Sequence, residues 1–276
     1  MMELIQKAHQ LRLKMVYMCA QNGGHIASAL SCIDIIVALY YGGVLKFDPQ
    51  NPAWDDRDRF ILSKGHGEIA LYAILADCGF FPEEWLETRY RKGDCFLGGH
   101  PDKHIPGVEA TTGSLGHGLS IAAGISLASK MDARSHLQFV LLGDAECAEG
   151  SIWEAAIFAS KHTLDNLIAI VDRNHLGAMD FTENFTALEP FADKWKAYGW
   201  EVSAVNGHDL QQLHEVFHYG RTRCDNRPLV IIAQTTKGKG VSFIENDPTW
   251  HTRTLSSDEE IQRALKELGR THDGGF

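Results

Sequence analysis

Two kinds of apolar pattern alternate along this chain. Continuous apolar runs bounded by polar or glycine-rich segments predict buried strands at residues 59–63, 137–142, 166–171, 200–205 and 228–234. Apolar residues spaced three or four positions apart predict helices at residues 3–20, 29–41, 82–89, 119–130, 151–162, 191–198, 209–219 and 257–268, with another beginning at Glu68. Because strands and helices alternate, we predict an α/β fold: a doubly wound, mainly parallel sheet with helices on both faces.

The length and charge of the chain limit its organisation and partners. A chain of 276 residues fits one large domain with a substantial buried core. We expect a single domain over residues 1–276, with an amino-terminal helix within residues 1–24 and a flexible tail at residues 270–276. The formal net charge of −10 and the pI near 5.7 argue against nucleic acid or an anionic membrane surface as a general partner.

Apolar runs and cysteine spacing indicate where the protein works. No run approaches the roughly 18 apolar residues that a membrane span needs, and the first residues are amphipathic rather than signal-like. The six cysteines show no C-x-x-C pair and no zinc spacing, so buried reduced thiols are expected. We therefore expect a cytoplasmic protein with no membrane partner, in which Cys147 fills space rather than acting as a catalytic thiol.

Residues 137–180 hold the strongest candidate site. One apolar run ends at Gly143-Asp144 and the next at Asp172 to Asn174, and the helix between them predicts a right-handed βαβ unit. Ligands of open parallel sheets bind outside the carboxyl ends of the strands, where Asp144 and Asn174 are expected. Carboxylate and amide oxygens suit Mg²⁺, which commonly takes phosphate oxygens as well. The stretch predicts a metal–diphosphate site, although Asp144 and Asn174 could instead simply end strands and cap a turn.

Histidines beside glycines recur in the predicted loops. His25 follows Gly23-Gly24, where the backbone can approach a ligand closely. His66 lies between a predicted strand and a predicted helix, a position at which helix N–H groups meet phosphate. His100 lies in a loop rich in glycine and proline, and such loops often carry function. Residues 111–118 contain three glycines and could cradle a phosphate, but their spacing is not that of a Walker or Rossmann loop.

The spacing of these groups resembles a known family. Gly143-Asp144 is followed by Glu149-Gly150 and by an Asn thirty residues after the Asp, as in the thiamine diphosphate motif of transketolases. The segments GHGEIA, GGHPD, TTGSLGHG and KGKGVSF are similar to that family too. From about His9 to about His251, the chain resembles the amino-terminal half of a transketolase, which implies the thiamine-diphosphate-binding fold.

The resemblance implies a role for each of several residues. The expected cofactor-binding residues are His66, Gly113, Leu115, Gly143, Asp144, Ala145, Glu149, Asn174 and His251. The expected metal ligands, for Mg²⁺ or another divalent cation such as Ca²⁺, are the side chains of Asp144 and Asn174 and the carbonyl of Leu176. The expected catalytic residues, which would position hydroxyls and move protons, are His25, His100 and His251.

The sequence departs from the family pattern at several positions. Ala145 stands where the family usually has Gly, which would cost on the order of 1 kcal/mol only if its φ were positive. His251 is followed by Thr252 rather than Gly, and His117 stands where Gln is common. Glu149 lies near the subunit interface in the family, and it could also serve as an acidic residue at a helix start. Lys237, among glycines, would be a solvated basic residue or part of a loop over the site.

In transketolases the Glu that activates the cofactor belongs to a second, pyrimidine-binding domain, which would follow residue 276. We therefore hypothesise the amino-terminal subunit of a split transketolase, active only with a separate carboxy-terminal subunit in an α2β2 assembly. It would transfer a two-carbon ketol unit from a ketose, expected to be phosphorylated, to an aldose, with thiamine diphosphate as the electron sink. Two alternatives stay open at this point: the α chain of a 2-oxo acid dehydrogenase, and a non-catalytic binding or regulatory protein with this fold.

Overall fold

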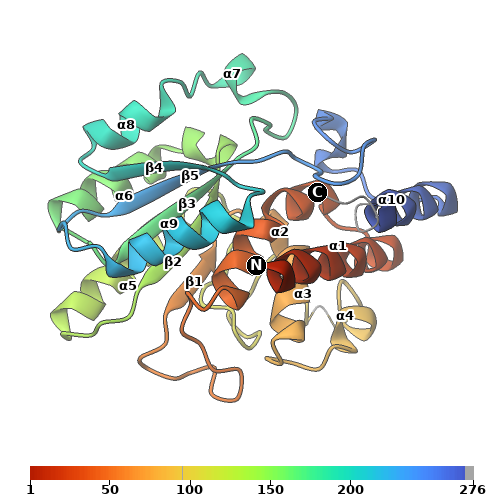
Figure 1. Cartoon of the computed structure of the whole chain (residues 1–276), viewed down its shortest axis with the longest axis horizontal. Coiled ribbons are helices and arrows are strands. Elements are labelled where there is room, and N and C mark those ends of the chain that lie inside the picture. The colour runs from red at the N-terminus through yellow and green to blue at the C-terminus, as the bar shows by residue number, and fades with distance from the viewer. Residues whose placement is uncertain (95, 271–276) are drawn as a thin grey trace.

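A five-stranded parallel sheet forms the centre of the computed structural model, which describes residues 1–94 and 96–270. Its strand order is β1-β2-β3-β5-β4, and every neighbouring pair is parallel (Figure 1). The strands are β1 (Arg59–Leu62), β2 (Gln138–Gly143), β3 (Leu167–Arg173), β4 (Glu201–Asn206) and β5 (Leu229–Gln234). Since all strands run the same way, their carboxyl ends share one edge of the sheet, which we call the carboxyl rim.

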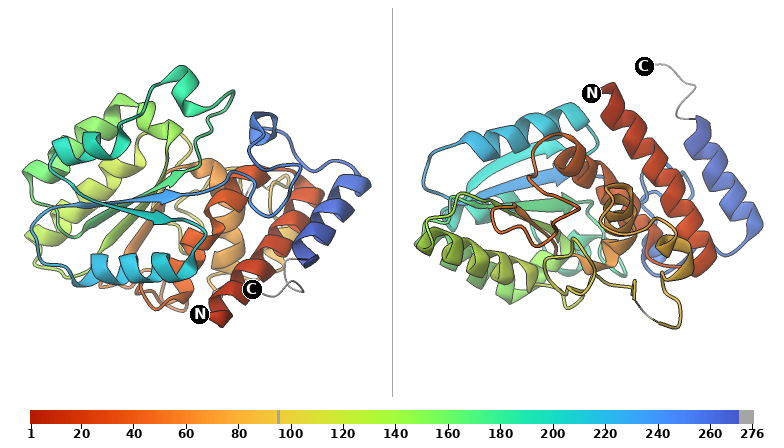
Figure 2. Two further views of the ribbon diagram at one scale, coloured as in Figure 1. Left: turned by 45° about the horizontal axis from the view of Figure 1, so that its top comes forward. Right: turned by 90° about the horizontal axis from the view of Figure 1, so that it is seen from below.

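Helices α2 (Ile26–Tyr41), α3 (Glu68–Asp77) and α9 (Leu210–Thr222) belong to the larger of two apolar cores. Helix α2 is buried on all sides, and α1 (Met2–Asn22) packs outside it. Helix α10 (Asp258–Arg270) lies beside α1 (Figures 1 and 2). Residues 271–276, the rest of the predicted flexible tail, lie outside the described residues.

Helices α5 (Gly118–Met131), α6 (Gly150–Lys161) and α8 (Phe191–Ala197) cover the opposite face of the sheet. Alternate residues of β3 enter the two cores: Ile168 and Ile170 face the first, while Ala169 and Val171 face the second. The alanines of α6 that face the sheet let the helix lie close to it. The predicted doubly wound α/β fold with helices on both faces is therefore confirmed.

Short helices lie in the loops between these elements. They are α4 (Trp85–Thr88), α7 (Thr182–Phe185) and the 3₁₀ turns η1 (Gly65–Gly67), η2 (Ala145–Ala148) and η3 (Pro248–His251). Among the residues that the structure describes, no helix has the length and apolar character needed to cross a membrane. The five cysteines in this part of the chain form no disulfide.

Two predicted boundaries near the candidate site were wrong. The helix expected from residue 29 begins at Ile26, directly after His25, so His25 stands at the helix start rather than in a loop. The strand expected to end at residue 171 continues through Asp172 and Arg173. Two charged residues can lie in this buried strand because each is paired with an opposite charge.

Candidate functional site

Asp144 and Asn174 lie side by side at the carboxyl rim because of the strand register. Gly143 of β2 pairs with Asp172 of β3, so the residues that follow each strand emerge together. Asp144 also caps η2, where its Oδ1 accepts a hydrogen bond from the Ala145 N–H at 2.7 Å. Asp144 therefore does cap a turn, which the sequence left open as an alternative. The cap does not remove its carboxylate from the rim.

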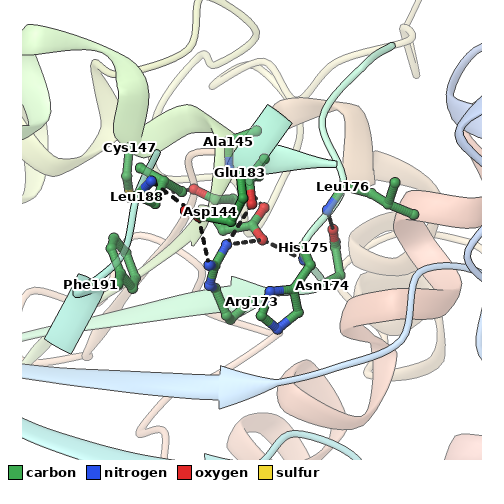
Figure 3. Close-up of polar contacts among 12 residues, drawn as sticks. Asp144, Ala145, Cys147, Arg173, Asn174, His175, Leu176, Glu183, Leu188 and Phe191 are labelled. Atoms are coloured by element: carbon green, nitrogen blue, oxygen red, sulfur yellow. Dashed lines mark hydrogen bonds and ion pairs between the residues drawn. The ribbon is translucent and has the colours of Figure 1, made fainter. Parts of the chain in front are cut away.

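The Asp144 carboxylate is almost fully buried. Its Oδ2 accepts from the His175 N–H at 2.6 Å and from the Arg173 guanidinium at 3.1 Å (Figure 3). His175 reaches this position with a positive φ of 64°. Burial and the charge of Asp172 raise the pKa of Asp144, and Arg173 and the two backbone N–H groups oppose that rise.

Asn174 is held in one orientation by its amide nitrogen. The Nδ2 group donates to Ser31 Oγ at 3.1 Å and to Asp172 Oδ2 at 3.2 Å, and Oδ1 accepts from the Leu176 N–H at 3.0 Å. The Leu176 carbonyl accepts no hydrogen bond within the described part of the chain. A carboxylate oxygen, an amide oxygen and a free carbonyl oxygen are a donor set that Mg²⁺ accepts. No group of three His, Cys, Asp or Glu side chains among the described residues could hold a metal.

The four histidines that the sequence singled out come together. The centroid of the His25 ring lies 5.8 Å from that of His66, 6.3 Å from that of His100 and 5.9 Å from that of His251. The rings of His66 and His251 are 5.2 Å apart. They come from the start of α2, from η1, from the loop after α4 and from η3, so only the fold unites them.

Burial keeps these imidazoles neutral. It lowers the pKa of His25 and of His251 to about 4, with neighbouring His and Lys charges acting in the same direction. The pKa of His66 is held well below its usual range for the same reasons, and that of the more exposed His100 is also lowered, first by burial. The Nδ1 atom of His25 is buried and has no hydrogen-bond partner among the described residues. Neutral rings with free nitrogens are suited to binding hydroxyl groups.

Lys237 lies between the histidines and the metal-ligand turn. Its Nζ donates to the Gly177 carbonyl at 3.0 Å and lies 2.8 Å from His251 Nδ1. The side chain is buried and forms no ion pair with a carboxylate within the described ranges. Burial, together with the charge of Lys64, lowers the pKa of Lys237 to about 8. A buried ammonium without a carboxylate is a ready partner for an anion, so Lys237 is not the solvated basic residue that was one expectation.

Gly113 has a φ of 138° and packs closely against two parts of the site. A Cβ at Gly113 would approach His100 Cδ2 to 3.0 Å, and a Cβ at Gly65 would approach Gly113 N to 2.9 Å. Leu115 is half-buried, outside both apolar cores. Glu149 is exposed at the start of α6. These placements fit the predicted roles but do not test them.

The structure also places Ala145, His117 and His104. Ala145 lies in η2 and does not have a positive φ, so the crowding expected in that case does not arise. His117 is exposed at the start of α5. His104 Nδ1 lies 2.8 Å from Asp102 Oδ1 in an exposed position.

Sequence reasoning missed the charged residues beneath the rim. Lys64 and Asp172 form a buried ion pair, and Asp172 also accepts from Ser31 at 2.8 Å. Buried Glu146 accepts from the Gly116 and Gly143 N–H groups, both at 2.9 Å, and thereby joins the turn at residues 111–118 to the end of β2. The available signal was a charged residue at the end of an apolar run, as in NLIAIVD.

A comparison with family models finds one that matches residues 3–276, described as "Transketolase, thiamine diphosphate binding domain". The chain is 43% identical over 269 residues to one subunit of the apulose-4-phosphate transketolase of Actinobacillus succinogenes, and the match covers 96% of each chain. It is 42% identical over 246 residues to the 6-deoxy-6-sulfo-D-fructose transketolase subunit SqwG of a Clostridium species, covering 89% of this chain and 88% of that one.

Solved structures show the same likeness. The transketolase of Campylobacter jejuni superposes with a TM-score of 0.84 at 30% identity, and the match covers 97% of this chain but only 42% of the other. The transketolase of Leishmania mexicana gives a TM-score of 0.87 at 27% identity, with 96% of this chain and 41% of the other covered. The chain therefore spans less than half the length of these proteins.

Proposed function

This chain belongs to the transketolase family, and we propose that it is the thiamine-diphosphate-binding subunit of a two-chain transketolase. It transfers a two-carbon ketol unit from a ketose, which we take to be phosphorylated, to an aldose. The observation that carries the proposal is the grouping of Asp144, Asn174 and four neutral histidines at one rim of the sheet. The family match favours this reaction over 2-oxo acid chemistry and over a purely regulatory role.

The residues at the rim fit the cofactor and a divalent cation. Asp144, Asn174 and the Leu176 carbonyl would hold Mg²⁺, or another divalent cation such as Ca²⁺, through three oxygens. Buried Lys237 and the neutral rings of His66 and His251 would contact the negatively charged diphosphate. When bound, thiamine diphosphate supplies the electron sink that carbon–carbon bond cleavage needs.

The remaining predicted residues would shape the cofactor site. We assign Gly113 to the pyrimidine end through its carbonyl and Leu115 to packing in the bend of the cofactor. Gly143 and Ala145 lie where the backbone would meet the diphosphate, and Glu149 lies at the edge that would face a neighbouring subunit. The close packing of Gly113 on His100 supports a pyrimidine end next to the substrate histidines.

The histidines of the cluster are the groups that would handle the sugar. His25 and His100 would bind hydroxyls of the ketose, since a neutral imidazole offers one donor and one acceptor. His251 accepts from Lys237 through Nδ1, which leaves its Nε2 to donate toward a substrate oxygen. Because burial lowers the pKa values of His25 and His251 to about 4, both rings stay neutral at neutral pH. The Nδ1 of His25, unpartnered in the part of the chain that the structure describes, would accept a hydrogen bond from a substrate hydroxyl.

The proposed partner is a separate carboxy-terminal subunit that carries the pyrimidine-binding domain, in an α2β2 assembly. Two observations support a partner: relatives that match along most of their length are named as subunits, and the matched full transketolases are more than twice as long. The segment after β3 offers exposed apolar side chains next to the rim, those of Met179, Phe181 and Phe185. The reduced cysteines support the cytoplasmic location that belongs to the same proposal.

A reconstitution assay tests the proposal. The purified chain is mixed with the protein encoded beside it, thiamine diphosphate and Mg²⁺, and ketol transfer from a phosphorylated ketose to an aldose is measured. We expect activity only from the mixture. Full activity from this chain alone would contradict the two-chain proposal, and ketol transfer that survives Asp144→Ala would contradict the metal site.

A further inference from the structure

Arg173, the last residue of β3, fills a buried position beside Asp144. Its side chain is only 1% exposed. The guanidinium donates to Asp144 Oδ2 at 3.1 Å (Figure 3). It also donates to Thr182 Oγ1 and to Glu189 Oε1, both at 2.8 Å. It also reaches Glu183 Oε1 at 3.3 Å. The side chain thus connects the Asp144 carboxylate to the segment that follows β3.

The hydrogen bonds of Asp144 divide unequally between its two oxygens. Oδ2 accepts two, from the His175 N–H and from Arg173, whereas Oδ1 accepts one, from the Ala145 N–H. Each carboxylate oxygen has about two lone-pair sites. Oδ2 is therefore fully used, and only Oδ1 has a site left for a cation. Without Arg173, each oxygen would keep one backbone hydrogen bond and have one open site, so a cation could bind to either oxygen.

Two further carboxylates, besides that of Asp144, balance the charge of Arg173. Glu183 and Glu189 both contact the guanidinium, and the ring of Phe191 lies 5.4 Å from it. Three carboxylates and one guanidinium leave this contact group net negative, so the arginine does not make the rim repellent to a cation. These contacts also hold the arginine in place independently of Asp144.

We propose that Arg173 is a positioning residue for the divalent cation, because it occupies Oδ2 and so presents Oδ1 as the single ligand atom of Asp144. This inference rests on the proposed function, since it concerns the cation that would accompany thiamine diphosphate. Partners that orient a metal-ligating carboxylate commonly change metal affinity by about 10-fold to 100-fold when removed.

Electron paramagnetic resonance tests the role of Arg173. It measures the Mn²⁺ affinity of the chain mixed with thiamine diphosphate and the protein encoded beside it. We expect Arg173→Met to weaken Mn²⁺ binding by about 10-fold to 100-fold, and Arg173→Lys to recover part of the loss because it keeps the charge. Arg223→Met is the matched control. Arg223 is also buried, with a side chain 2% exposed, and ion-paired, but with Glu201 at the amino-terminal end of β4. It should lower the melting temperature without changing Mn²⁺ affinity.

The outcomes separate the inference from the proposed function. If the wild-type mixture with the protein encoded beside it does not bind Mn²⁺ with thiamine diphosphate, the proposed cofactor site is wrong. If the wild type binds and Arg173→Met binds equally well, the positioning role is overturned. A crystal structure with Mn²⁺ covers the case in which Arg173→Met does not fold. Ligation through Oδ1 with Arg173 still on Oδ2 supports the inference, and ligation through Oδ2 overturns it.

Discussion

Removal of the Lys64 charge from the buried Lys64–Asp172 pair should destabilise the protein strongly. The two side chains are 1% and 0% exposed. Burial alone would lower the pKa of Lys64 and raise that of Asp172, but their mutual attraction reverses both shifts. Lys64→Met leaves an uncompensated buried carboxylate, which typically costs about 3–5 kcal/mol. Because Asp172 keeps donors such as Ser31 and Asn174, we expect a loss near the lower end, about 3 kcal/mol.

Urea denaturation of the chain without cofactor measures this loss. The double variant Lys64→Met/Asp172→Asn should recover at least half of it, since no buried charge then remains. Lys130→Met is the surface control: Lys130 pairs with Asp165 at 2.6 Å with about a third of each side chain exposed, so its loss should stay below about 1 kcal/mol. If Lys64→Met costs no more than Lys130→Met, the pair is solvated and the reasoning is wrong.

Further variants address single residues. Burial raises the pKa of Glu68 to about 8. Its neutral form therefore stabilises the folded chain at low pH, and that stability is lost as pH rises from about 4.5 to 8. Glu68→Gln should raise the melting temperature at pH 8 but not at pH 4, whereas Glu154→Gln, at an exposed position, should not show this difference. The pKa of His25 is lowered to about 4, so the free energy of unfolding should fall as pH drops from about 6.5 to 4. His25→Gln should make the free energy of unfolding depend less on pH, as measured by urea titrations at several pH values. An unchanged pH dependence would contradict this prediction. Ala145→Gly should lower stability by about 0.5–1 kcal/mol in thermal unfolding, because φ at this position is not positive and Gly gains nothing there. For the same reason Mn²⁺ affinity should stay within about twofold. Tighter Mn²⁺ binding would show that the Ala145 Cβ crowds the cofactor.

The fold was predictable because its signals are local. The apolar runs and helical spacings that define β2, α6 and β3 lie within residues 137–173, and alternation alone implies a parallel sheet. Asp144 and Asn174 could be placed at one rim by the same argument, since each follows a strand. The glycine-flanked histidines were candidate site residues because of their neighbouring glycines. Only the resemblance to transketolases assigned His25 and His251 to the same site.

The missed residues depend on contacts that no local pattern encodes. Lys64 and Asp172 are 108 positions apart in the chain, so neither predicts the other. The apolar run before Asp172 indicated that the strand ends there, and the paired charge that lets it continue is visible only in the fold. The sequence placed Lys237 in a loop among glycines but could not predict that its side chain is buried. The contact of Lys237 with the Gly177 carbonyl leaves no pattern in the sequence.

Because His175 has a positive φ, its backbone and its side chain contact different partners. The backbone N–H holds Asp144, whereas the imidazole turns away and meets Gln234 at 3.0 Å. Residues that tolerate this conformation, such as Gly, Asn and Asp, should therefore be accepted at position 175, and Val and Ile should be rejected. Directed-evolution libraries could vary this position freely within that set.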